Sequence, residues 1–467
     1  MKKSPNFLIL HLVLAALFLS GCGGGQEEGS FDLEDVNVLL IVVDTMGAGH
    51  VGAWSEGLDT SPNMDALARE GVKFNRAYSP APWTQPAVAS LFTGQTPSRN
   101  KVLHLMDTLP DSSFTLARAL GERGFRTSGV ISHFLINTKQ GFGQGFERFN
   151  DNAVGGHRAV TSQEVTRNAI MEMRRLKDER FFLFVHYFDP HSEYMHHEEF
   201  DQTSGYQGQV HEWSRDIVSL RYNRHKMVDA DVDFLRGLYR EEISYTDKFI
   251  GKLLAQLETL GLKENTLVIL TADHGEEFME HDWIGHTHFL YDTLLHVPMV
   301  FSLPGRLQPR VVDEPVSLND IMPTLMDLSR TPPQDASWDG RSLKELLDGA
   351  SGKWKRPLFS EVSFLAPDDE KDTPAAEKEA FLAAVSLENW KLIHDLDEDR
   401  WMLFDRDADP LEKRDLFNPD HGKVQQMQPL LLEWEKGKVE TWGREFKDLQ
   451  PMSEEERKRL RSLGYVR

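Results

Sequence analysis

Continuous apolar runs that alternate with helical segments limit the fold of this chain more than any other feature. The clearest runs are VLLIVV at 38–43, FFLFVHY at 181–187 and LVIL at 267–270, with further strands expected at 72–78, 125–132 and 297–302. An uninterrupted apolar run is typical of a parallel strand that is covered on both faces. Helical patterns lie between the runs, at 62–70, 87–93, 115–121, 161–176, 231–260 and 319–328. The alternation predicts an α/β fold with a doubly wound, mostly parallel sheet flanked by helices.

The pattern changes beyond about residue 357. Short runs at 381–386, 390–394 and 401–404 predict a small antiparallel sheet closed by helices. Residues 192–229 are polar without clear periodicity, and we interpret them as an inserted loop over one face. The chain is therefore expected to have four parts: a signal peptide with a lipobox (1–22), a flexible tether (23–34), a large catalytic α/β domain (35–350) and a C-terminal antiparallel sheet and helical subdomain (351–467).

The first residues have the features of a targeting segment. Lys2 and Lys3 precede an apolar stretch at 7–19 that is too short for a membrane-spanning helix. The stretch ends in Leu19-Ser20-Gly21-Cys22, which resembles a bacterial lipobox, and Cys22 is the only cysteine of the sequence. We expect lipidation of Cys22 and, because residue 23 is Gly and not Asp, an outer-membrane lipoprotein on the periplasmic or surface face. An ordinary cleaved signal peptide is the alternative.

The chain is strongly acidic. Its formal net charge of −22 at pH 7 argues against nucleic-acid binding, because the nucleic-acid backbone is also anionic. Carboxylates in such a chain can instead gather around bound cations.

Polar side chains follow three of the predicted buried strands. In chain order they are Asp44, then His186, Asp189 and His191, and then Asp273 and His274. In doubly wound sheets, ligands bind beyond the carboxyl ends of the strands. These side chains are therefore expected to converge on one site, with His286, twelve residues after His274, beside them.

The residue types at these strand ends are those of metal sites. Asp44, Asp273 and His274 offer two carboxylates and an imidazole, a mixed set that suits Zn²⁺ or Mn²⁺ better than Ca²⁺, which prefers oxygen alone. Two neighbouring metals would clamp the attacking and leaving oxygens of a displacement. A second group is predicted to hold that second metal or the anionic part of a substrate: Asp189, His191 and His286.

Thr84 lies just before a helix that Pro86 opens. Unpaired backbone N–H groups at a helix N-terminus favour an anion there. A hydroxyl at this place can act as a nucleophile when a metal lowers its pKa, and can itself contact the metal; simple helix capping is the alternative. His186, His191 and His288 are candidates for proton transfer to the leaving group.

A series of short motifs runs along the chain from about residue 36. They are Asp44-Thr45, Ser61-Pro62-Asn63-Met64-Asp65, Ser90-Leu91-Phe92-Thr93-Gly94, Phe188-Asp189-Pro190-His191, Ala272-Asp273-His274-Gly275-Glu276, Leu290-Tyr291-Asp292, His296-Val297-Pro298, DIMPTL at 320–325, Asp339-Gly340, Leu403-Phe404-Asp405, Asp409-Pro410 and Leu463-Gly464-Tyr465. In this order they resemble the sulfatase family of the alkaline phosphatase superfamily. The resemblance implies the fold expected above and a metal-dependent ester hydrolase.

Two positions depart from the pattern of that family: Thr84 stands at the Cys or Ser position, and Val88 stands at the Arg position. Sulfatases carry a Cys or Ser followed by x-Pro-x-Arg, and the Cys or Ser is oxidised to formylglycine. The matching stretch here is Thr84-Gln85-Pro86-Ala87-Val88, and Thr cannot become formylglycine. Thr is the nucleophile in related branches such as the phosphoethanolamine transferases, whose zinc ligands have a spacing similar to that from His274 to His286.

These observations together predict a metal-dependent hydrolase or transferase of small anionic esters, including glycan or lipid-headgroup esters. Phosphate and phosphonate esters are favoured over sulfate, with one or two Zn²⁺ as cofactor and Mn²⁺ or Ca²⁺ as alternatives. Two other functions stay open: a true sulfatase acting on sulfated glycans, and a lipoprotein that binds anionic glycans or lipids without turnover. Metal content separates them, because two zinc ions favour the first reading, one calcium the second and no metal the third.

Overall fold

The computed structural model describes residues 32–153, 161–212, 217–330, 338–350, 354–365, 379–436, 438, 453–463 and 465. The predicted signal peptide and lipobox, including Cys22, and nearly all of the tether lie outside these residues. The outer-membrane lipoprotein therefore stays a prediction.

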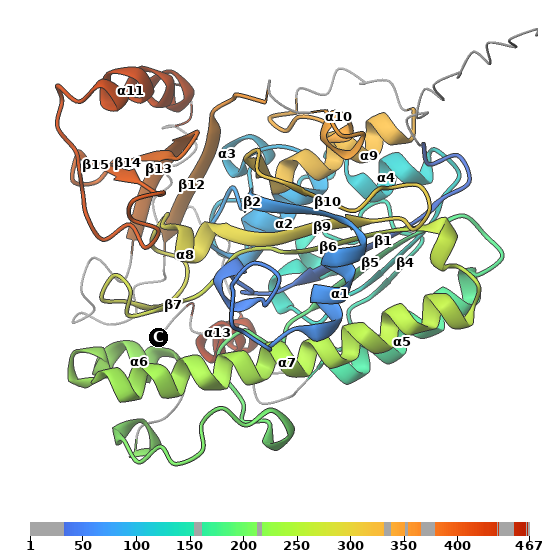
Figure 1. The fold of residues 1–467 in the computed structure, drawn as a ribbon, viewed down its shortest axis with the longest axis horizontal. Helices are drawn as coiled ribbons and strands as arrows, with labels where there is room; N and C mark the ends of the chain where they lie inside the picture. Colours follow the sequence, from blue (N-terminus) through green and yellow to red (C-terminus); the bar gives the residue numbers. More distant parts are fainter. Residues whose placement is uncertain are drawn as a thin grey trace, which may run out of the picture. The chain divides into compact units, whose positions relative to one another are not determined.

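A nine-stranded sheet forms the centre of the described structure (Figure 1). Its order is β10 (Arg310–Val312), β2 (Val72–Tyr78), β9 (His296–Ser302), β6 (Thr266–Ala272), β1 (Asn37–Val43), β5 (Phe181–Tyr187), β3 (Arg126–Val130) and β4 (Arg148–Asn150), with β11 (Val316–Ser317) beside β2. Among these described strands only β9 runs against the others, since it pairs antiparallel with both β2 and β6. The predicted doubly wound, mostly parallel sheet is confirmed.

The register of the three central strands aligns their carboxyl ends. Val43 at the end of β1 is paired with Tyr187 of β5 on one side and with Ala272 of β6 on the other. All three strands are buried along their whole length, as their apolar runs predict. The residues that follow these strands therefore leave the sheet side by side at one edge.

Helices cover both faces of the large sheet (Figure 1). On one face, α1 (Pro62–Glu70) and α5 (Ser162–Leu176) pack against the long α7 (Asp229–Thr259). On the other, α2 (Thr84–Thr93) and α4 (Leu116–Gly121) pack against α9 (Ile321–Leu328). This arrangement buries both faces of the strands, which is the condition for a parallel sheet.

The stretch 192–229 is more ordered than the sequence suggests. It contains α6 (Ile217–Asn223), and the loop before it is held on α7 by two buried glutamates. Met195 N donates to Glu242 Oε1 at 2.8 Å, and His197 N donates to Glu241 Oε2 at 2.8 Å. The inserted loop predicted here is present at 192–212, where Glu241 and Glu242 of α7 hold it, whereas 217–223 forms a helix that the sequence pattern does not indicate.

A second sheet follows the large one in the chain. It is antiparallel, with the order β12 (Leu358–Leu365), β13 (Glu379–Leu387), β14 (Trp390–Asp395) and β15 (Arg400–Asp405), and α11 (Gly422–Glu435) packs on it. β12 is tied to the segment after β2, since Glu361 N donates to Pro80 O at 2.9 Å. The small antiparallel sheet is confirmed, and the boundary between residues 350 and 351 stays a prediction.

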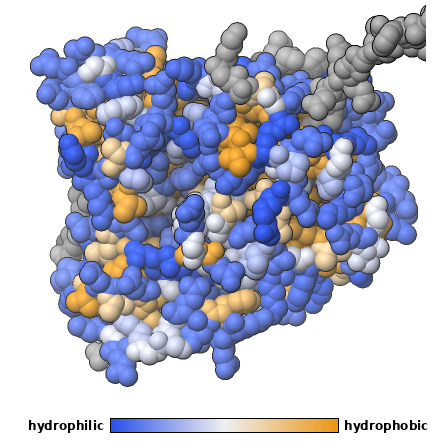
Figure 2. Space-filling view, viewed as in Figure 1, coloured by the Kyte–Doolittle hydropathy of each residue, from blue (hydrophilic) through white to orange (hydrophobic). Residues whose placement is uncertain are grey.

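The surface is mainly polar on the face shown in Figure 2, where apolar residues form only small scattered patches. Within the described ranges, no helix combines the length and the apolar content that crossing a bilayer requires.

Candidate active site

Asp44 and Asp273 form the centre of a buried polar cluster at the ends of β1 and β6. Both side chains are fully buried. Thr45, which has a left-handed φ of 53°, donates its N–H to Asp273 Oδ1 at 3.1 Å, and the His274 N–H donates to the same oxygen at 2.9 Å. These bonds fix the turn after β1 against the end of β6 and leave Asp273 Oδ2 to the cluster.

His186 of β5 joins the two carboxylates. Its Nε2 lies 3.7 Å from Asp273 Oδ2 and 3.9 Å from Asp44 Oδ2. Among the described residues, none of these three atoms has a hydrogen-bond partner, although all are buried. Buried polar atoms are rarely left in this state without a ligand or ion to satisfy them. Two carboxylates and an imidazole in this arrangement form a possible site for a divalent metal.

The electrostatics of Asp44 also suit a cation. Burial, together with the charges of Asp273 and Glu276, raises the pKa of Asp44 well above its ordinary value. A bound divalent cation would offset this repulsion between buried carboxylates. Without a cation, the charged carboxylates of this cluster destabilise one another, and a bound divalent metal would remove this repulsion.

Thr84 presents its hydroxyl to the same cluster from the start of α2. Its Oγ1 lies 3.3 Å from Asp44 Oδ1 and 3.2 Å from His274 Nε2. The N-cap position of α2 is Trp83, so capping does not account for the residue at 84. Every residue of α2 is buried, which holds this hydroxyl firmly in place.

His274 presents one nitrogen to the site. Its Nδ1 donates to the carbonyl oxygen of Gly275 at 2.9 Å, so Nε2 carries the lone pair. That nitrogen lies 3.6 Å from Asp44 Oδ1 and 3.8 Å from Asp273 Oδ2. Only glycine fits at 275, because a Cβ there would lie 2.1 Å from the carbonyl oxygen of Thr293.

Two further histidines lie beside His274. The ring centroid of His286 is 4.6 Å from that of His274 and 4.9 Å from that of His191. His286 Nδ1 is 2.8 Å from Glu276 Oε1. Burial raises the pKa of Glu276 to about 8, and burial also lowers the pKa of His286 well below its ordinary value. The structure thus places His286 next to His274 and His191 next to His286, and their predicted role at a second metal or a substrate anion stays a prediction.

Asp189 has a different place from the one predicted. Its carboxylate accepts hydrogen bonds from Thr161 N at 2.7 Å, Thr161 Oγ1 at 2.5 Å and Ser162 N at 2.7 Å. These donors occupy both oxygens and place Asp189 at the N-terminus of α5, where a carboxylate is stabilising. The geometry does not support Asp189 as a metal ligand, and we leave it out of the proposed set.

His288 lies next to an aromatic cluster at the rim of the site. Its Nδ1 is 2.5 Å from Thr287 Oγ1, and its ring centroid lies 4.8 Å from Trp283 and 5.0 Å from Phe364. It is close enough to His286 for its charge to contribute to the lowered pKa of that residue. Its predicted part in proton transfer stays a prediction.

Three residues of the site were not among those predicted from the sequence: His133, Glu276 and Tyr465. His133 Nε2 lies 3.6 Å from Asp44 Oδ2 and follows β3, so the rule that polar residues gather at strand ends could have found it. Glu276 belongs to the same short motif as Asp273. The Tyr465 hydroxyl lies 3.3 Å from His286 Nε2, and no local pattern places it there.

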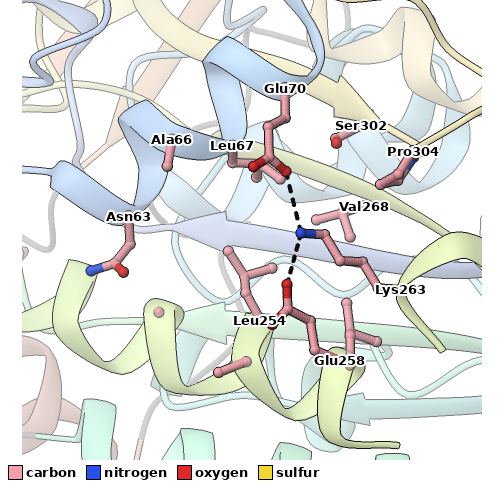
Figure 3. Close-up of a pocket in the computed structure, with 13 residues that line it drawn as sticks. Asn63, Ala66, Leu67, Glu70, Leu254, Glu258, Lys263, Val268, Ser302 and Pro304 are labelled. Carbon is pink, nitrogen blue, oxygen red and sulfur yellow. Dashed lines mark hydrogen bonds and ion pairs between the residues drawn. The ribbon is translucent and has the colours of Figure 1, made fainter. Parts of the chain in front are cut away.

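A separate pocket lies between α1 and α7 (Figure 3). Lys263 bridges the two sides, with its Nζ 2.8 Å from Glu258 Oε1 and 3.5 Å from Glu70 Oε2. The residues that line this pocket include none of the Asp44 cluster. It is therefore distinct from the candidate active site.

Comparison with known families identifies the family to which this chain belongs. The model of the family described as Sulfatase matches residues 36–331, more than half of the chain. The chain belongs to the sulfatase family. A second model, described as N-sulphoglucosamine sulphohydrolase, C-terminal, matches residues 279–436 of this sulfatase-family protein. The prediction that the chain is an ester hydrolase of this family is thereby confirmed, without the class of ester that it cleaves.

Relatives of this sulfatase-family chain differ in the ester they are named for. An N-acetylglucosamine-6-O-sulfatase of Bacteroides thetaiotaomicron is 23% identical, over 93% of this chain and 91% of the relative. The phosphonate monoester hydrolase of Silicibacter pomeroyi has a TM-score of 0.70 at 19% identity, over 90% of this chain and 98% of that one. A structure in complex with D-glucosamine-2-N,6-O-disulfate has a TM-score of 0.67 at 18% identity, over 89% and 99%. At these identities the structures show a shared fold, and both ester classes occur on it.

Proposed function

We propose that this protein is a metal-dependent hydrolase of phosphate or phosphonate esters that uses Thr84 as its nucleophile. The observation that carries the proposal is the position of Thr84 Oγ1, 3.3 Å from Asp44 Oδ1 and 3.2 Å from His274 Nε2. Its side chain is a secondary alcohol, which forms esters with phosphorus but cannot become the formylglycine on which sulfate hydrolysis in this family depends.

The proposed metal ligands are Asp44, Asp273, His186 and His274. Asp44 Oδ2, Asp273 Oδ2 and His186 Nε2 have no hydrogen-bond partner within the described structure, and His274 Nε2 lies 3.6 Å from Asp44 Oδ1; both observations support this set. Mixed oxygen and nitrogen donors favour Zn²⁺ or Mn²⁺ over Ca²⁺. When bound, such a metal would lower the pKa of a neighbouring hydroxyl and offset negative charge on the substrate.

The chain's own residues would carry out the displacement in two steps. Thr84 Oγ1 gives its proton to solvent and forms a bond to phosphorus, while the bond from phosphorus to the leaving oxygen breaks and its electron pair stays on that oxygen. The leaving oxygen then takes up a proton, for which His191, His286 and His288 are the candidates. In the second step the oxygen of a water molecule forms a bond to phosphorus and loses a proton to solvent, while the bond from phosphorus to Thr84 Oγ1 breaks and Oγ1 takes up a proton, which restores the hydroxyl.

Thr84→Ala tests the proposal most directly. The variant should lose hydrolysis of aryl phosphates and phosphonates by roughly a thousandfold or more, because the covalent route is removed. The matched control is Thr93→Ala at the other end of α2, where the hydroxyl donates to Ala89 O at 2.7 Å and accepts from Gln95 N at 3.4 Å. Mass spectrometry of the quenched wild-type reaction should find phosphoryl or phosphonyl groups on Thr84; a modified residue elsewhere would refute the assignment.

Sulfate esters are the second candidate substrates, because the relative from Bacteroides thetaiotaomicron is named as a sulfatase over nearly its full length. Matched aryl sulfates, phosphates and phosphonates with one common leaving group separate the two. A higher kcat/KM for the sulfate would reject our preference while keeping the site.

A further inference from the structure

The last described residues of the chain reach the candidate active site. α13 (Glu454–Ser462) places Leu460, Leu463 and Tyr465 in an apolar cluster with Trp83, the residue before the nucleophile. The Tyr465 N–H donates to Leu460 O at 3.0 Å, which fixes the backbone of Tyr465 to the helix. Its ring lies 5.9 Å from Trp83, and only 3% of the residue is exposed.

α13 is attached to the large domain by polar contacts as well. Ser453 caps the helix through the Glu456 N–H at 3.2 Å, and Glu456 also pairs with Lys139. Arg459 lies over the ring of Phe134 with its Cζ 5.2 Å from the centroid. The position of Tyr465 is therefore set by a helix that is fixed on several sides.

The hydroxyl of Tyr465 meets the nucleophile and a site histidine together. It lies 3.3 Å from His286 Nε2, and the side chain of Thr84 is close enough to influence the pKa of Tyr465. The tyrosine ring is 5.8 Å from the ring of His286 and 6.1 Å from that of His191. The hydroxyl thus stands beside the atom that would attack the ester.

We propose that Tyr465 is a substrate-contacting residue, whose hydroxyl donates a hydrogen bond to a non-bridging oxygen of the anionic ester at Thr84. This inference rests on the proposed function. An ester attacked by Thr84 Oγ1 places its non-bridging oxygens on the phosphorus bonded to that atom, on a site that the Tyr465 hydroxyl faces from beside His286 and Trp83. A phenol, whose ordinary pKa is about 10, is a neutral donor at pH 7 and suits this task.

Tyr465→Phe separates this role from packing, because phenylalanine keeps the ring and loses only the hydroxyl. We expect kcat to fall by about a hundredfold, the effect typical of losing one donor to a developing charge, with little change in melting temperature. Tyr222→Phe is the matched control, since Tyr222 is 65% exposed and should leave both quantities unchanged. A kcat of Tyr465→Phe within twofold of the wild type would overturn the proposal.

Binding of inorganic vanadate to the metal-loaded protein, measured by calorimetry, gives a readout that does not need turnover. Tyr465→Phe should bind vanadate about tenfold more weakly than the wild type, as expected for a lost hydrogen bond to a charged group. If the wild type hydrolyses no ester of the panel but shows this difference, the proposed function fails and the contact stands. Equal vanadate affinities would overturn the contact even in an active enzyme, and a wild type that neither binds nor turns over would overturn both.

Discussion

In the large sheet, His186, Asp44 and Asp273 come together through the register of three adjacent parallel strands. In the C-terminal region, by contrast, the contacts with the site come from side chains on separate elements, Phe364 on β12 and Tyr465 after α13. β5, β1 and β6 end side by side, so the register of these strands is sufficient to bring their polar residues together. Tyr465 and Phe364 meet the site only because their own elements pack on Trp83. In our proposal the first region provides the metal ligands, and the second provides side chains that cover the site.

A buried polar network joins the two regions. Lys391 of β14 is fully buried and donates to Leu290 O at 2.9 Å and to Glu412 Oε2 at 2.9 Å. It also pairs with Asp292 just after the site histidines, and Arg406 lies 3.5 Å from the same carboxylate. The attraction of Lys391 and Arg406 outweighs burial and lowers the pKa of Asp292. Disturbing this joint should affect the fold, whereas disturbing the strand ends should affect the chemistry.

The largest effect is expected at the strand ends. Asp44→Asn removes one charged member of the proposed ligand set, so metal content should fall and kcat/KM should drop by about a thousandfold. Mass spectrometry measures the metal content, and the aryl ester assay measures kcat/KM. The matched control is Asp189→Asn, which should keep the metal and lower the free energy of unfolding by at most about 1 kcal/mol, because its carboxylate holds the start of α5. Loss of metal in the control would restore Asp189 to the ligand set.

An intermediate effect is expected at the joint between the sheets. Lys391→Met leaves Asp292 and Glu412 buried without their cation and should lower the free energy of unfolding by about 3–5 kcal/mol, measured by urea denaturation. Metal affinity of the folded variant should be unchanged. Lys355→Met, which removes an exposed partner of Glu388, should leave stability nearly as it was. If the two variants were equally stable, the joint would not hold the regions together.

The smallest effect is expected in the pocket of Figure 3, whose lining includes none of the residues of the Asp44 cluster. Lys263→Met removes two partly exposed ion pairs that solvent screens, so stability should change by no more than about 0.5 kcal/mol. Ester hydrolysis should be unaffected. A tenfold loss of kcat would show that this pocket is coupled to the active site, and that the effects on catalysis are not confined to the strand ends.

Much of the large sheet could be predicted because its determinants are local. The run at 181–187 is β5 to the residue, and the strand at 72–78 is β2 to the residue. Once the strands are placed, the convergence of Asp44, Asp273 and His274 follows from topology alone.

The errors have one physical cause, which is that distant partners decide the role of a polar side chain. Asp189 follows a strand as Asp44 does, but its partners at Thr161 and Ser162 come from the start of a helix that precedes it in the chain. His186 was assigned to proton transfer because its neighbours across the sheet were unknown. Tyr465 lies near the end of the sequence, and only the packing of α13 shows that it belongs with Thr84.

The place of Tyr465 has a consequence for the order of synthesis. A ribosome makes Asp44 early and Tyr465 last among the described residues, so a growing chain can align its central strands before the tyrosine has been translated. Such a partial chain would bind a cation at the strand ends, but Tyr465 would not yet cover the site beside Thr84. A chain that stops before Tyr465 should therefore be a weaker catalyst even where Asp44, His186 and Asp273 have come together.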